Sequence, residues 1–156
     1  MALDLKQTIV TVKGLIIFGW IIASIRLVLD LSAPEISMYF GVYYGMPLVY
    51  LYYGLTGKMD HLSWSRLAIA MVVVAFFVWF IPNVITYTTA QFMGWEFGRF
   101  SADRNEWIQD SSIRKVLSGL GISAVTFVAG SVWSIVFGSV LIFLPRRFRK
   151  KSSHTA

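Results

Sequence analysis

Long apolar stretches without charge are the feature that most constrains this chain. Residues 36–55 are twenty residues with no charged side chain, enough helix to cross the roughly 30 Å apolar core of a bilayer. The composition agrees, with 14% charged residues where a soluble domain has about 25%. We therefore exclude a soluble or disordered chain. We expect an all-α integral membrane protein, because unpaired sheet edges are not stable in lipid.

Four apolar segments are predicted to cross the membrane, at about 10–29, 36–55, 67–87 and 116–144. The short links at 30–35 and 56–66 predict an antiparallel four-helix bundle. A single membrane domain then covers residues 1–145, and residues 146–156 form a basic cytoplasmic tail. Pro145 is expected to end the last helix. A cleavable signal peptide is the alternative for the first segment, but its apolar run continues past the small residues Ala23 and Ser24.

Lysine and arginine are divided unequally between the two sides of this arrangement. Nine lie on the side that holds both termini and the 56–66 loop, and five lie on the other side. This excess predicts that both termini face the cytoplasm and that the chain lies in the cytoplasmic (inner) membrane. The net charge of +6 therefore reports topology, and no sequence feature supports binding to nucleic acid. The tail is expected to attract anionic lipids through Arg146, Arg147, Arg149, Lys150 and Lys151.

Small residues at helical spacing mark candidate packing faces. Gly41 and Gly45 form a GxxxG motif in the second segment, and Gly130, Ser134 and Gly138 repeat the spacing in the fourth. Small side chains let two helix backbones approach closely. We expect packing within the bundle, and the alternative is a face that docks on a membrane-protein partner or a second copy.

Two prolines inside predicted helices, Pro47 and Pro82, each remove a backbone donor and predict a kink. Polar residues follow Pro82 and form a candidate polar seam, which consists of Asn83, Thr86, Thr89 and Gln91. Hydrogen bonds between helices account for such a seam. A hydrated vestibule for a substrate or an ion is the alternative.

Arg26 is the one charged residue well inside a predicted span. An ionisable residue in the membrane is a candidate functional site. Because Asp30 lies one turn onward, we expect a structural ion pair of Arg26 with Asp30, or with Glu35.

The sequence has few other residues that could bind a metal or act in catalysis. The chain has no cysteine and two histidines, and no predicted span contains Asp, Glu or His. This argues against proton pumping and against a metalloprotease site, and no cofactor is implied. Tyr43, Tyr44 and Tyr50 lie deep in the second segment and need hydroxyl partners, which a backbone carbonyl or a bound quinone or pigment could supply.

The connection at 88–115 is too aromatic for a free loop, with Trp95, Phe97, Phe100 and Trp107. A capping box at Asp103 and Glu106 predicts a short amphipathic helix there. We expect this segment to lie in the membrane interface or against another protein.

Two functional classes follow. One is a structural, accessory or assembly subunit without recognisable catalytic machinery, acting through helix packing and the outer loop. The alternative is a small homo-oligomeric transporter or channel that uses the proline kinks and the polar seam. An enzyme acting on a lipid or isoprenoid is third, because no set of catalytic residues supports it.

Overall fold

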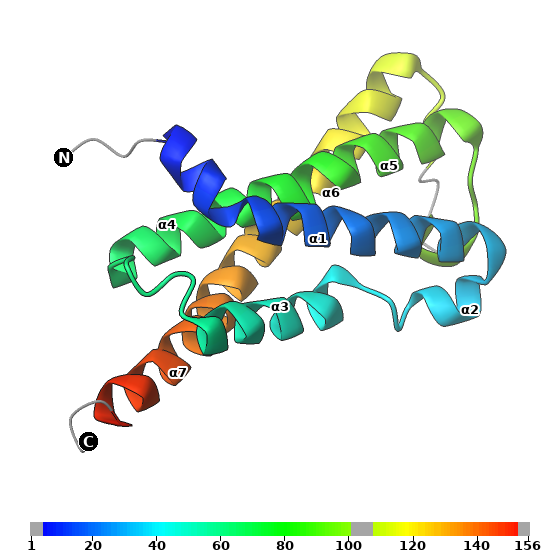
Figure 1. The fold of residues 1–156 in the computed structure, drawn as a ribbon. Helices are drawn as coiled ribbons and strands as arrows, with labels where there is room; N and C mark the ends of the chain where they lie inside the picture. The colour runs from blue at the N-terminus through cyan, green and yellow to red at the C-terminus, as the bar shows by residue number, and fades with distance from the viewer. Residues whose placement is uncertain (1–4, 101–107, 153–156) are drawn as a thin grey trace.

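The computed structural model describes residues 5–100 and 108–152, which contain helices and no strand. The helices form four long stretches of chain, joined by shorter elements (Figure 1). In chain order the elements are α1 (Leu5–Ser32), α2 (Pro34–Ser37), α3 (Val42–Thr56), α4 (Trp64–Ala75), the π-helix η1 (Phe76–Phe80), α5 (Ile81–Met93), the 3₁₀ turn η2 (Gly98–Phe100), α6 (Ser112–Trp133), the π-helix η4 (Ser134–Gly138) and α7 (Ser139–Ser152).

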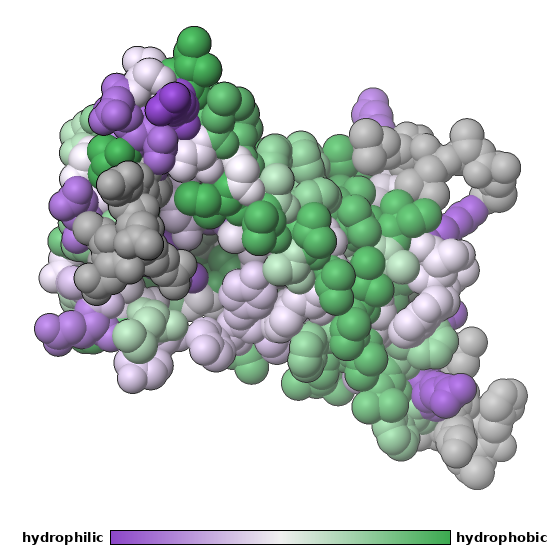
Figure 2. Space-filling view, turned by 180° about the vertical axis from the view of Figure 1, so that it is seen from behind, coloured by the Kyte–Doolittle hydropathy of each residue, from purple (hydrophilic) through white to green (hydrophobic). Residues whose placement is uncertain are grey.

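Three helical stretches are long and apolar enough to cross a membrane. They cover Lys6–Ser32, Trp64–Met93 and Ser112–Phe148. Only 17%, 33% and 28% of their most apolar windows is buried inside the chain, so most of each window faces outward, as it does in helices that contact lipid. Figure 2 shows this distribution, with apolar residues across the middle of the face and hydrophilic residues toward its two ends. The described residues are thus helical throughout their regular structure, and the three long apolar helices are compatible with a multi-pass membrane protein.

The predicted helix at 36–55 is interrupted in the structure. The chain is helical in the single turn of α2, leaves the helix at residues 38–41, and resumes in α3. Gly41 caps α3 with an extended backbone (φ −121°, ψ 154°), a conformation outside the helical region. The fifteen residues of α3 measure about 22 Å at the helical rise, which is less than the bilayer core.

Two other predicted boundaries also differ. The last helix begins at Ser112, where the hydroxyl of Ser111 accepts the backbone N–H of Arg114 at 3.3 Å. It continues through Pro145 to Ser152, so Pro145 does not end it. In membrane proteins, neighbouring groups can satisfy the backbone that a proline leaves unpaired, which permits a helical proline.

A widened turn precedes Pro82, in the middle of the α4–α5 stretch. The N–H of Ile81 bonds to the carbonyl of Phe76, five residues earlier, in the π-helix η1. The carbonyl of Phe77 loses that donor and instead accepts the indole N–H of Trp20 in α1 at 2.9 Å. The expected disturbance at Pro82 is therefore a π-helix, and it ties α4–α5 to α1.

The small residues of both predicted packing faces meet neighbours within the chain. A Cβ added at Gly45 would clash with Ile22 of α1, and one at Gly130 would lie 2.6 Å from the ring of Trp79. Gly138 lies against Met71 and Tyr50 in the same way, and Gly41 lies near Arg26. The hydroxyl of Tyr50 donates to Ser134 Oγ at 3.1 Å. These faces contribute to the close packing of α3 and of α6–α7 inside one chain.

Candidate functional site

A buried ion pair joins the end of α1 to the loop after α5. Asp30 is fully buried, and its Oδ2 lies 2.8 Å from Nε of Arg99, whose side chain is 16% exposed. The guanidinium of Arg99 also lies over the rings of Tyr87 and Phe100, at 5.5 and 4.9 Å from the ring centres. The short turn η2 carries Arg99 to this position because it packs against α2. The pair therefore fixes the η2 loop onto α1 and α2.

The structure differs here from the expected pair of Arg26 with Asp30. Within residues 5–100 and 108–152, the carboxylate of Asp30 is paired with Arg99, and no carboxylate lies within 4 Å of the Arg26 guanidinium. Helical side chains lean toward the N-terminus, so Arg26 points away from the residue one turn onward. The order of an arginine before an aspartate is also the less favourable one for such a pair. The sequence did not indicate that Arg99 takes this place.

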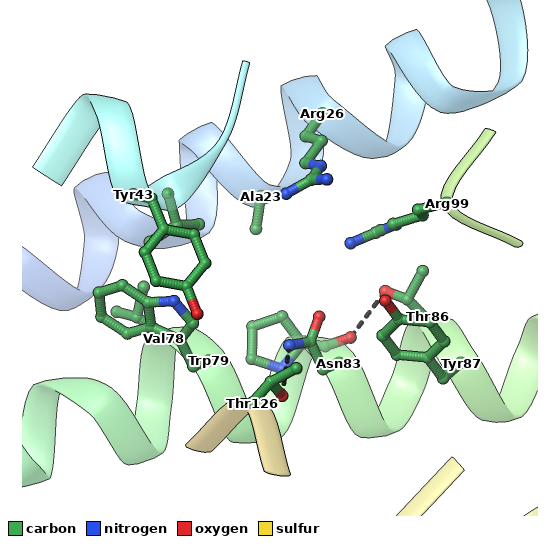
Figure 3. Close-up of a pocket in the computed structure, with 12 residues that line it drawn as sticks. Ala23, Arg26, Tyr43, Val78, Trp79, Asn83, Thr86, Tyr87, Arg99 and Thr126 are labelled. Atoms are coloured by element: carbon green, nitrogen blue, oxygen red, sulfur yellow. Dashed lines mark hydrogen bonds between the residues drawn. The ribbon is translucent and has the colours of Figure 1, made fainter. Parts of the chain in front are cut away.

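Arg26 instead points into a cavity of about 190 Å³ (Figure 3). Nε of Arg26 is buried and has no hydrogen-bond acceptor among the described residues. Arg99 reaches toward the same space from η2, at the right of Figure 3. The cavity lies between α1, α3, η1, α5, η2 and α6, and its lining comprises Ala23, Arg26, Val42, Tyr43, Val78, Trp79, Pro82, Asn83, Thr86, Tyr87, Arg99 and Thr126.

The two arginines and Asp30 determine the charge at this cavity. One carboxylate faces two guanidinium groups, which leaves one positive charge in excess among the described residues. Burial lowers the pKa of the Arg99 guanidinium; Asp30 raises it, and Arg26 lowers it by repulsion.

The predicted polar seam is divided between different places. Asn83 and Thr86 line the cavity, where Asn83 Nδ2 donates to Thr126 Oγ1 of α6 at 2.9 Å and the hydroxyl of Thr86 donates to the carbonyl of Pro82 at 2.6 Å. Thr89 is exposed. Gln91 is fully buried, and its side-chain oxygen accepts the backbone N–H of Gln109 at 2.9 Å. Half of the seam therefore belongs to the cavity, and Gln91 holds the loop instead.

The three deep tyrosines also have different surroundings. Tyr43 lines the cavity and packs edge-on against Trp79, with ring centres 5.7 Å apart. Tyr50 is fully buried and bonded to Ser134, whereas Tyr44 is 67% exposed. The hydroxyl partner that Tyr50 requires is thus a serine of the same chain.

The aromatic residues after α5 pack against one another. Phe100 is 1% exposed and contacts the rings of Tyr87, Trp95 and Phe97 at centre distances of 5.3 to 6.0 Å. Phe100 is therefore covered by the chain itself, whereas Trp95 and Phe97 are half-buried. The helix predicted after Asp103 lies outside the described residues.

The basic tail begins inside α7. Nη1 of Arg146 donates to the carbonyl of Leu62 at 2.8 Å, so this arginine joins α7 to the loop before α4. Arg147 is exposed, and Arg149, Lys150 and Lys151 continue the helix.

No protein-family model, curated protein or solved structure matches this chain. Its function therefore has to be inferred from the chemistry of the cavity.

Proposed function

We propose that this chain is a four-pass protein of the cytoplasmic membrane that binds a small polar ligand in the Arg26–Arg99 cavity. The observation that carries the proposal is a cavity with arginine, asparagine and threonine in its lining, inside a molecule whose outer surface is largely apolar. Burying such groups is costly unless they are hydrogen-bonded. Asn83 and Thr86 are bonded within the chain, whereas Nε of Arg26 has no acceptor among the described residues and is the group that a ligand or water would satisfy. Within the membrane, irregular backbone is tolerated where it lines a cavity, and the break before α3 borders this one.

Four passes are supported by the directions of the helices. In Figure 1 the start of α1 and the end of α7 lie at the same end of the molecule, as an even number of passes requires. The α2–α3 segment, residues 34–56, makes the second pass as an interrupted helix. The excess of basic residues at the end that holds both termini supports a cytoplasmic position for that end.

Ligand binding suits this chain better than a purely structural role. The accessory-subunit hypothesis invoked helix packing and the outer loop together with the absence of catalytic residues, and Gly45, Gly130 and Gly138 pack against neighbours within the chain and not toward a partner. The cavity has a volume of about six water molecules at some 30 Å³ each, below the 300–1,000 Å³ of sites for drug-sized ligands. The ligand is therefore a small ion or one chemical group of a larger molecule.

The first experiment tests whether water reaches the cavity. The chain contains no cysteine, so Thr86→Cys introduces a single thiol into the lining. In nanodiscs we expect this thiol to react with neutral methyl methanethiosulfonate, because a thiolate forms readily only in a hydrated site. The control is Val125→Cys, at a position that is 70% exposed on the apolar surface and faces lipid. If Thr86→Cys reacts as slowly as this control, the cavity is closed and the proposal is wrong.

Transport is the second candidate function. It is favoured by the interrupted helix, because in many transporters the N-terminus of such a half-helix lies at the substrate site. Val42 and Tyr43, at the start of α3, line the cavity. Flux of radiolabelled inorganic phosphate into proteoliposomes, compared with protein-free vesicles, distinguishes transport from binding alone. Cross-linking in the same vesicles then shows whether any flux requires a homo-oligomer.

A further inference from the structure

Arg26 has a different environment from Arg99, although both face the cavity. Arg99 is neutralised by Asp30 and covered by two aromatic rings. Arg26 has no carboxylate partner in the described part of the chain, and its Nε is buried without an acceptor. Arg26 is only half-buried as a residue, but a guanidinium whose Nε is buried is unfavourable unless water or an anion contacts it. The side of Arg26 that faces the cavity is therefore suited to an anion.

The start of α3 adds to this preference for negative charge. Gly41 caps α3, and a Cβ at Gly41 would lie 3.4 Å from Nη1 of Arg26, so the guanidinium lies beside the first turn of the helix. The first N–H groups of a helix have no partner within it, and the helix dipole makes this end positive. Together they attract an anion to the same place as Arg26.

The donor geometry indicates which anions fit. A guanidinium presents two parallel N–H groups that match the two oxygens of a carboxylate or a phosphate. The volume of about 190 Å³ admits one such group with a few water molecules. Asn83 and Thr86 lie on the opposite wall, on α5, where they can contact the further oxygens of the group or its water (Figure 3).

We propose that the cavity is an oxyanion site, in which Arg26 binds a phosphate or carboxylate group while the Asp30–Arg99 pair closes the side toward η2. This inference rests on the proposed function, because it specifies the ligand of the same cavity. The oxyanion has two sources, a soluble anion or the headgroup of an anionic lipid, and both offer the same chemistry to Arg26.

The test compares thiol reagents of opposite charge at Thr86→Cys. We measure the rate at which the introduced thiol reacts with two methanethiosulfonates, an anionic sulfonatoethyl reagent and a cationic trimethylammonium-ethyl reagent. Each rate is divided by the rate of the same reagent with a free thiol in solution. The anionic reagent should be favoured by about tenfold or more, since a unit charge within about 10 Å has an effect of this size at an effective dielectric near 20. The same ratio in Arg26→Gln should fall about tenfold, and Arg26→Lys should preserve it because the charge remains.

The matched control is Arg114→Gln, which removes an exposed arginine near the start of α6, outside the cavity lining. It should leave the ratio unchanged, whereas a general surface potential would lower it as much as Arg26→Gln does. Gel filtration and circular dichroism establish that each variant is folded. If Arg26→Gln does not fold, the ratio in the parent chain and its protection by anions decide the question.

Protection of the Thr86→Cys thiol by added anions distinguishes a soluble anion from a lipid headgroup. In nanodiscs of phosphatidylcholine, inorganic phosphate that slows the anionic reagent identifies a site for a soluble anion. Slowing by phosphatidylglycerol in the disc, without added phosphate, identifies a lipid headgroup. A preference for the cationic reagent, an unchanged ratio in folded Arg26→Gln, or protection by neither anion overturns the oxyanion site and leaves a hydrated cavity. Failure of the neutral reagent at Thr86→Cys overturns both proposals.

Discussion

At the scale of single residues, the role of each arginine at the cavity depends on whether it is paired with Asp30. Asp30 is fully buried beside Arg99, so loss of either member leaves a buried charge without its partner. Arg26, by contrast, has no carboxylate to lose within the described residues. Two arginines in one cavity thus have separate roles, one holding the fold and the other available to a ligand.

The effect of replacing a glycine likewise depends on its position, and Gly54 is the clearest example. A Cβ at Gly54 would clash with the backbone carbonyl of Leu141 and lie 3.0 Å from Cα of Ile142, so the α3 and α7 backbones must separate. We expect Gly54→Ala to lower the free energy of unfolding by about 1–3 kcal/mol. Gly121→Ala is the control, because nothing lies within 4 Å of its Cβ position and alanine favours a helix by up to about 1 kcal/mol. Thermal unfolding in detergent measures both, and equal melting temperatures for the two variants would contradict the close approach.

At the scale of elements, the π-helix before Pro82 determines how α4–α5 meets α1. Proline has no N–H, so the ladder of helical bonds cannot continue at this point. The carbonyl of Phe77 then accepts the indole of Trp20, and the next turn carries Asn83 and Thr86 into the cavity wall. Pro82 therefore lines the cavity itself and also affects it through the geometry of the turn that precedes it.

This link predicts energetic coupling between Trp20 and Pro82. Trp20→Phe removes one donor and leaves the Phe77 carbonyl unpaired, which should cost about 1 kcal/mol of stability. In a Pro82→Ala background the restored N–H lets the turn close as an α-helix, and the same substitution should cost less. A double-mutant cycle on the free energy of unfolding measures the difference. Additive effects would mean that the π-helix does not depend on Pro82.

At the scale of the whole molecule, the positions of the chain ends carry the proposed topology. We expect Ser65→Cys to face the cytoplasm and Ser112→Cys to face outward, because both serines are exposed and lie at opposite ends of membrane-spanning stretches. In intact cells a membrane-impermeant maleimide should therefore label Ser112→Cys and spare Ser65→Cys until the membrane is opened. The reverse pattern would invert the orientation, and labelling of both or neither would contradict a single pass between them.

The sequence by itself determined the helical character of the described residues and the approximate location of three helices that are long and apolar enough to cross a membrane. These properties depend on local composition, because a run of apolar residues favours lipid whatever surrounds it. Its aromatic residues also indicated that the connection at 88–115 is not free in water. The expected cover was the membrane interface or another protein, whereas Phe100 packs against Tyr87 of the same chain. Only the tertiary structure decided that Arg99 pairs with Asp30, that Gly41 interrupts the second segment, and that Arg26 faces a cavity. These features join residues far apart in the chain, and their energies depend on distance and burial, which residue spacing along one helix does not specify.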